Sequence, residues 1–148
     1  MVETAFVLFI LVMFAFGVTE FGRAMYTKNT LNNAARAGAR AAVVTTGLPT
    51  TSSTTLVKLP QTDCTKYGTT GDDPVYQAVC NSLFSGITKS QVSVSISGPN
   101  NPAKFNDTIT VEVDYGTAGQ ANTGFQSVVP KLILIRNVLT GQASMRYE

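Results

Sequence analysis

The chain has 148 residues, a net charge of +2 and only 14% charged residues. This composition excludes the clustered basic side chains by which proteins bind nucleic acid. Histidine is absent, so the most common general base and metal ligand is missing. No nucleophile elbow, phosphate-binding loop or catalytic triad pattern occurs either. We therefore expect no enzyme, no catalytic residue, no metal, no cofactor and no nucleic-acid partner.

Residues 4–18 form an apolar run that follows a single carboxylate, Glu3. Eleven large apolar side chains lie between Phe6 and Val18. At about 1.5–3 kcal/mol for each side chain, leaving them in water would cost roughly 16–33 kcal/mol. The run must therefore lie in lipid or against other protein. Because a charged n-region and an A-x-A-like cleavage site are missing, we expect the run to be retained.

Residues 2–44 are predicted to form one helix. A stripe of small and apolar residues at three-and-four spacing follows its second half. The residues of this stripe are Leu31, Ala34, Ala35, Gly38 and Ala42. Arg36 and Arg40 lie on another face and are expected to be solvated. A helix of about 43 residues is about 65 Å long, too long for the rest of the chain to cover, so its apolar end is expected to protrude.

The remaining residues, 45–148, are long enough for one small head domain. Residues 45–62 are rich in threonine and serine and contain two prolines, which predicts a loop. Asp73, followed directly by a proline, is typical of a helix start. A second, short helix is therefore predicted over residues 74–85, with Gly86 ending it.

Alternation of apolar and polar residues predicts the strands of the head. The predicted strands are residues 91–97, 108–115 and 139–148. An apolar segment, residues 128–135, is expected to cross the core. Glu112 and Asp114 share the outward face of one strand and are expected to be solvated. The predicted fold is α+β, with a long protruding N-terminal helix packed on a small antiparallel sheet of three or four strands.

The two cysteines, Cys64 and Cys80, are separated by 15 intervening residues. In an oxidising compartment a disulfide between them would stabilise the head by about 3 kcal/mol. In a reducing compartment they would be two free thiols. The membrane-length apolar run favours the first case, so we expect the disulfide. A metal site would need more ligands than these two.

The order of the segments is characteristic. Val-Glu-Thr-Ala at residues 2–5 opens the apolar run, Glu-Phe-Gly-Arg follows at 20–23, and Leu-Asn-Asn-Ala-Ala-Arg-Ala-Gly-Ala-Arg follows at 31–40. Two alternating strands and the final segment, residues 139–148, complete the pattern. The chain thereby resembles the TadE-like pilins of the tight-adherence (Tad) branch of type IV pilus systems.

This resemblance implies a type IV pilin-like fold and a structural role. Residues 1–44 would be the membrane span and later the filament core, and residues 45–148 the pilin head. A prepilin peptidase would process the chain at the inner membrane. The pilus assembly machinery would then extract it into an extracellular filament made of identical subunits, used for surface adhesion.

The resemblance also assigns roles to residues. Glu3 matches the glutamate near the N-terminus of these pilins and is expected to pair with the α-ammonium of Met1, in its own or an adjacent subunit. The desolvation cost of such a buried pair nearly cancels its electrostatic attraction, but losing one partner costs about 3–5 kcal/mol. Glu3 would therefore fix the register between subunits; the alternative is a solvated carboxylate at the lipid headgroups. Packing in the helix core is expected from Phe6, Phe9, Phe14, Phe16, Gly17 and Phe21.

Glu20 and Arg23 lie three residues apart and can pair along the helix. We expect them to form a charge pair where the helix leaves lipid; the alternative is a contact between subunits. Two other functions remain open for the whole chain. It could be a minor TadE-type pseudopilin that primes or caps a filament of another pilin, or a single-pass membrane-anchored binding protein.

Overall fold

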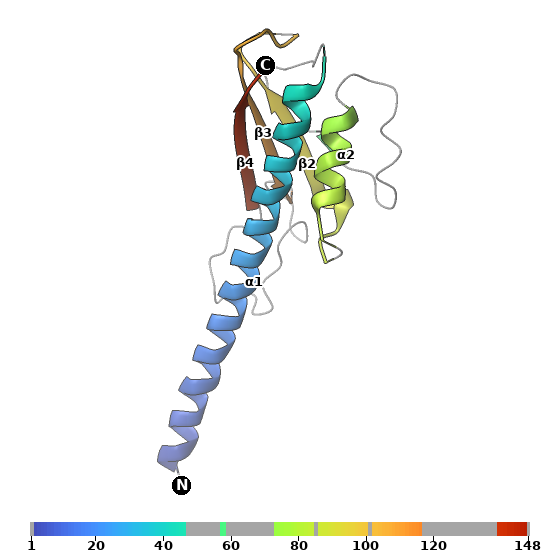
Figure 1. Cartoon of the computed structure of the whole chain (residues 1–148). Helices are drawn as coiled ribbons and strands as arrows, with labels where there is room; N and C mark the ends of the chain where they lie inside the picture. The colour runs from blue at the N-terminus through green and yellow to red at the C-terminus, as the bar shows by residue number, and fades with distance from the viewer. Residues whose placement is uncertain are drawn as a thin grey trace.

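The computed structural model describes residues 2–46, 57–58, 73–84, 86–100, 102–116 and 139–147. It contains a long helix, a short helix and a four-stranded antiparallel sheet (Figure 1). Both helices lie on one face of the sheet, with α1 in front of β3 and β4 and α2 beside α1 (Figure 1). This is the α+β arrangement that the sequence predicts.

The long helix α1 spans Val2–Val44, the range predicted from the sequence. Its C-terminal half packs on the sheet, and its N-terminal half extends away from it (Figure 1). The predicted stripe from Leu31 to Ala42 is buried, and Ala39 is buried with it. Arg36 and Arg40 are exposed, as expected. One helix therefore has two parts, of which only the second packs against the head.

The sheet has the strand order β1-β2-β3-β4, and each neighbouring pair is antiparallel. The strands are β1 (Val57–Lys58), β2 (Val92–Ser97), β3 (Thr108–Tyr115) and β4 (Leu139–Arg146). The short helix α2 (Asp73–Ser82) precedes β2, and a 3-10 turn, η2 (Lys89–Gln91), leads directly into it. Because β2 and β3 each have a neighbouring strand on both sides, they form the centre of the sheet.

The core lies between the helices and the sheet. Alternate residues of β3 point into it, and Ile109, Val111 and Val113 are fully buried. Val75 and Val79 of α2 close the core from the side. On β2 the residues facing away from the helices are buried as well: Ser93 is 7% exposed and Ser95 is 3% exposed. Both faces of this part of the sheet are therefore shielded from water.

Two glycines allow α1 to approach the sheet and α2 closely. A Cβ at Gly141 on β4 would lie 2.4 Å from the carbonyl carbon of Leu31 and 2.6 Å from the amide nitrogen of Asn32. A Cβ at Gly38 on α1 would lie 2.6 Å from Cγ2 of Val79. Gly141 meets backbone, which cannot move aside as a side chain can, so it sets the distance between β4 and α1.

The C-terminal end of α1 is tied to the end of β4. The hydroxyl of Tyr147 donates a hydrogen bond to the carbonyl of Thr45, 102 residues earlier in the chain. The main chain of Tyr147 also bonds to the loop before β3: it accepts from the Asn106 amide and donates to the Asp107 carbonyl. These contacts bring α1, β3 and β4 together at the end of the head that lies farthest from the N-terminus.

Glu112 is half-buried on β3, in contrast to the solvated position expected from its strand face. The reason is that β3 is an inner strand, so the side chain lies between Ser95 of β2 and Gln142 of β4. Burial raises the pKa of the Glu112 carboxyl above its ordinary value of 4.5, and the nearby Asp114 carboxylate raises it further. Asp114 itself accepts a hydrogen bond of 2.6 Å from the Thr140 hydroxyl.

Three local predictions need correction or lie outside the described residues. Val57–Lys58 forms strand β1 inside the segment predicted to be a loop. A strand of two residues is too short to show an alternating pattern in the sequence. Helix α2 ends at Ser82, before the predicted limit, because the chain turns at Phe84, whose carbonyl accepts from the Ile87 amide. The apolar segment 128–135 lies outside the described residues.

Replacing Gly141 with alanine is expected to destabilise the head by about 2 kcal/mol or more, because the added Cβ would overpack against helix backbone. Thermal unfolding of the full chain in detergent would measure this. Gly22→Ala is the matched control: nothing lies within 4 Å of a Cβ there, and alanine favours a helix interior by about 1 kcal/mol. Equal melting temperatures for Gly141→Ala and the wild type would contradict the close approach.

The raised pKa of Glu112 predicts a pH-dependent stability with a definite sign. The folded chain holds this proton more tightly than the unfolded chain, so stability should fall as pH rises from about 4.5 through the higher folded pKa. Glu112→Gln should remove this fall and make the head more stable than wild type at neutral pH. Denaturant titrations at several pH values would test this, with Asp114→Asn expected to reduce the fall only partly. Identical pH profiles for wild type and Glu112→Gln would argue against it.

Candidate assembly surface

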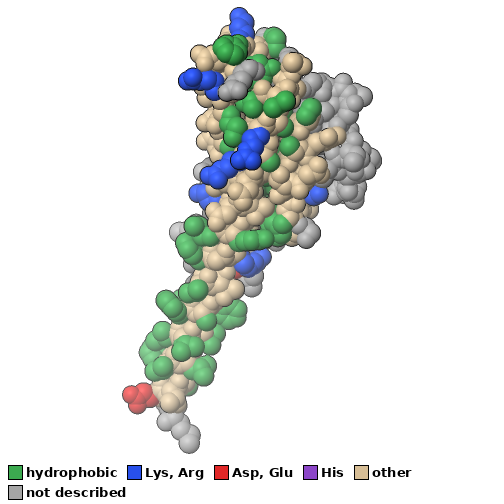
Figure 2. Space-filling model, viewed as in Figure 1, with side chains coloured by type: hydrophobic (Ala, Val, Ile, Leu, Met, Phe, Trp, Pro, Cys, Tyr) green, Lys and Arg blue, Asp and Glu red, His purple; other side chains and the backbone are tan. Residues whose placement is uncertain are grey.

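The N-terminal half of α1 exposes an unusual amount of apolar surface. Between Phe6 and Tyr26, fourteen large hydrophobic side chains are exposed, and the exposed fraction of Phe14 is 74%. Figure 2 shows these side chains along the projecting part of the helix, with one acidic side chain at its far end. By length and composition α1 could cross a membrane, and only 6% of its most apolar stretch is buried.

The apolar run, residues 4–18, is exposed on all sides of the helix. Consecutive residues of an α-helix are separated by about 100°, so an unbroken series such as Phe6–Phe14 covers the whole circumference. A helix that is apolar all round needs an apolar environment all round. A single flat partner would leave half of it in water. Lipid, or a bundle of several similar helices, would cover it completely.

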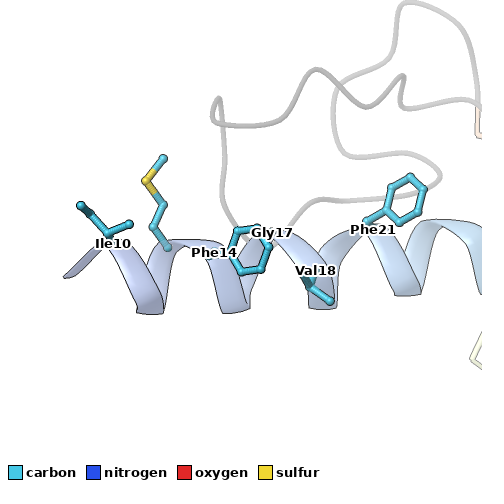
Figure 3. Close-up of a pocket in the computed structure, with 6 residues that line it drawn as sticks. Ile10, Phe14, Gly17, Val18 and Phe21 are labelled. Atoms are coloured by element: carbon cyan, nitrogen blue, oxygen red, sulfur yellow. The ribbon is translucent and has the colours of Figure 1, made fainter. Parts of the chain in front are cut away.

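The apolar run also has a shaped surface. Ile10, Phe14, Gly17, Val18 and Phe21 line a shallow hollow on the helix, together with Met13 (Figure 3). A Cβ at Gly17 would touch nothing within 4 Å in the described part of the chain. This glycine leaves space on the helix surface that a side chain from outside can fill. All six of the aromatic and glycine residues predicted to pack in a helix core lie on this exposed part of α1.

Polar groups in this part of α1 are few and mostly satisfied within the helix. The hydroxyl of Thr19 donates a hydrogen bond of 3.0 Å to the carbonyl of Ala15. Such bonds to the preceding turn remove the cost of placing a hydroxyl in an apolar environment. The surface therefore suits lipid and a helix bundle equally well.

Glu3 lies in the first turn of α1 and is exposed. A carboxylate there stabilises the helix by about 0.3–1 kcal/mol, because it faces the positive end of the helix dipole. Glu3 also borders an apolar hollow lined by Val7, Leu8 and Leu11. Met1 lies outside the described residues, so the pairing of Glu3 with its α-ammonium stays a prediction.

Glu20 and Arg23 lie at the N-terminal limit of the part of α1 that the chain itself covers. Glu20 is only 3% exposed, although Phe21 beside it is 63% exposed. A guanidinium nitrogen of Arg23 lies 3.4 Å from a carboxylate oxygen of Glu20, and the Arg23 side chain is 51% exposed. The two residues are thus brought together, while their role at a membrane surface stays a prediction.

The cysteines are described only in part. Cys80, the one cysteine within the described ranges, is fully buried on α2 and is not a free thiol. Cys64 lies outside the described residues, so its bond to Cys80 stays a prediction. Within the described ranges, no group of three or more His, Cys, Asp or Glu side chains could hold a metal ion.

One exposed surface could not be identified from the sequence. Apart from residues 6–26, the exposed large hydrophobic residues in the described part of the chain are Val44 and Phe105, with 82% and 80% of their surface accessible. Both lie at the end of the head farthest from the N-terminus. The only signal in the sequence is an isolated phenylalanine in the polar segment between two predicted strands.

Comparisons with known proteins bear on the N-terminal part of the chain. Searches of curated proteins and of solved structures gave no significant match. A search of family models gave a match, which begins at residue 1 and ends within the buried stripe of α1. It therefore includes Glu3, the apolar run and the Glu20–Arg23 pair. Over residues 1–40 the chain matches the model of the TadE-like protein family, which confirms the family resemblance found in the sequence.

Proposed function

We propose that this chain is a structural subunit of an extracellular, type IV pilus-like filament of the Tad type, used for surface adhesion. In this proposal residues 1–44 form the filament core and residues 45–148 form the head that surrounds it. The observation that supports it most is the exposure of the apolar run around the whole circumference of α1. Identical helices from neighbouring subunits would provide the cover on every side that a single chain lacks.

Before assembly the same surface would lie in the inner membrane. The stretch between Glu3 and Glu20 contains no charged residue, and its 17 helical steps correspond to about 26 Å. This is close to the hydrocarbon thickness of about 30 Å. Since lipid and a packed helix bundle are similarly apolar, moving the eleven large side chains of the run from one to the other costs little. Processing by a prepilin peptidase and extraction by the assembly machinery would then set the direction of this transfer, from the membrane into the filament.

Glu3 would give the filament its register. In a bundle its carboxylate would be surrounded by apolar side chains such as Val7 and Leu8, where an unpaired charge is costly. Pairing with the α-ammonium of Met1, in the same or an adjacent subunit, would remove that cost only at one axial offset between helices. A disulfide between Cys64 and Cys80 would stabilise the head outside the cell.

Shearing cells that express the chain and imaging the released fibres tests the proposal directly. We expect fibres in which this chain is present in stoichiometric amounts along the length. Trace amounts in fibres of another pilin would instead indicate a minor component that primes or caps them. Complete retention in detergent-soluble membranes, with no fibres, would contradict the filament role and favour a membrane-anchored binding protein.

Glu3→Ala is expected to leave the protein in the membrane and to reduce filament yield strongly, since losing one partner of a buried pair costs about 3–5 kcal/mol. Quantifying the chain in membrane and sheared fractions separates insertion from assembly. Glu3→Asp, which keeps the charge, is the matched control and should retain part of the yield. Normal filament yield from Glu3→Ala would remove Glu3 from the assembly mechanism.

A further inference from the structure

The end of the head farthest from the N-terminus combines exposed apolar and basic side chains. We call Val44, Lys104, Phe105 and Arg146 the distal tip. All four are exposed, and they come from the end of α1, the loop before β3 and the end of β4. Figure 2 shows hydrophobic and basic side chains together at this end of the molecule.

The loop that carries Phe105 is held in place by its own hydrogen bonds. The Asp107 carboxylate accepts two bonds of 3.0 Å from the side-chain amide of Asn100 and one of 2.7 Å from the Lys104 amide. Asn106 has a positive φ of 74°, a backbone conformation that costs energy for residues other than glycine. A phenylalanine in a loop fixed in this way points into water because the backbone holds it there.

The two apolar side chains of the distal tip, Val44 and Phe105, are exposed to water. Burying a large apolar side chain is favourable wherever an apolar phase is available. Arg40, one helical turn before Val44, adds a third cation to Lys104 and Arg146. The one described carboxylate of this loop, Asp107, is occupied by loop donors. The tip therefore offers apolar contact and positive charge at the same place.

We propose that the distal tip docks onto an anionic lipid surface. Anionic headgroups attract the basic side chains, and the boundary between headgroups and acyl chains accepts Phe105 and Val44. A polyanionic glycan would satisfy the cations but would offer no apolar phase to the other two residues. This inference rests on the proposed function for its direction. About 39 Å of helix separates the end of the apolar run at Val18 from Val44, so the tip faces a second surface and not the membrane that holds the chain.

Full-length protein in phosphatidylcholine nanodiscs allows a test that does not need filaments. The nanodiscs are mixed with vesicles of pure phosphatidylcholine, or of equal parts of phosphatidylcholine and phosphatidylglycerol, and bound protein is measured by flotation. We expect binding to the anionic vesicles, weakened by salt. Phe105→Ser should weaken it by about tenfold or more, and the double variant Lys104→Gln, Arg146→Gln should abolish the preference for anionic lipid.

Two controls define the outcome. Lys89→Gln removes a lysine from η2, at the opposite end of β2, and should bind like the wild type. Unchanged binding of Phe105→Ser, or equal binding of wild type to both kinds of vesicle, would overturn the proposal. Binding to soluble alginate that survives Phe105→Ser, without vesicle binding, would assign the tip to a glycan. If sheared fibres are absent while vesicle binding behaves as expected, the filament role fails and the tip proposal stands.

Discussion

A helix that is apolar around its whole circumference cannot be covered by the chain that contains it. The chain covers one stripe of α1, between Glu20 and Ala42, and leaves the large side chains of the apolar run exposed. The free energy of covering the run, of order 10 kcal/mol or more, must therefore come from lipid or from other helices. This constraint makes the N-terminal half of α1 a surface for association, whichever partner it has at a given time.

The two halves of α1 use opposite packing chemistries. The buried face of the C-terminal half consists mainly of alanine and glycine, and the backbone of β4 comes close to this half at Gly141. The exposed half consists of large side chains that fill space between molecules. This close backbone contact fixes the position of the head on the C-terminal half of α1. A fixed offset between neighbouring helices at Glu3 would consequently fix the orientation of neighbouring heads as well.

The sequence predicted the parts of the fold that depend on periodicity. The bounds of α1 and of strand 108–115, and the buried stripe on α1, follow from patterns of 3.6 and 2 residues. Periodicity does not tell which strands are neighbours, so the half-buried position of Glu112 on an inner strand could not be predicted. The close approach at Gly141 and the exposure of Phe105 depend on tertiary contacts, which leave no periodic signal.

The charges along α1 explain how one surface can serve two environments. Glu3 and Glu20 bracket a stretch without charge, and nothing inside it favours water over lipid or over a neighbouring helix. Each end carries a carboxylate, but only Glu20 is already shielded and paired within the chain, with Arg23. If the chain assembles as proposed, the environment of Glu3 would change on moving from the lipid headgroups into a helix bundle. The choice between membrane and filament would then depend on the partner of Glu3, while the apolar side chains would supply affinity for both.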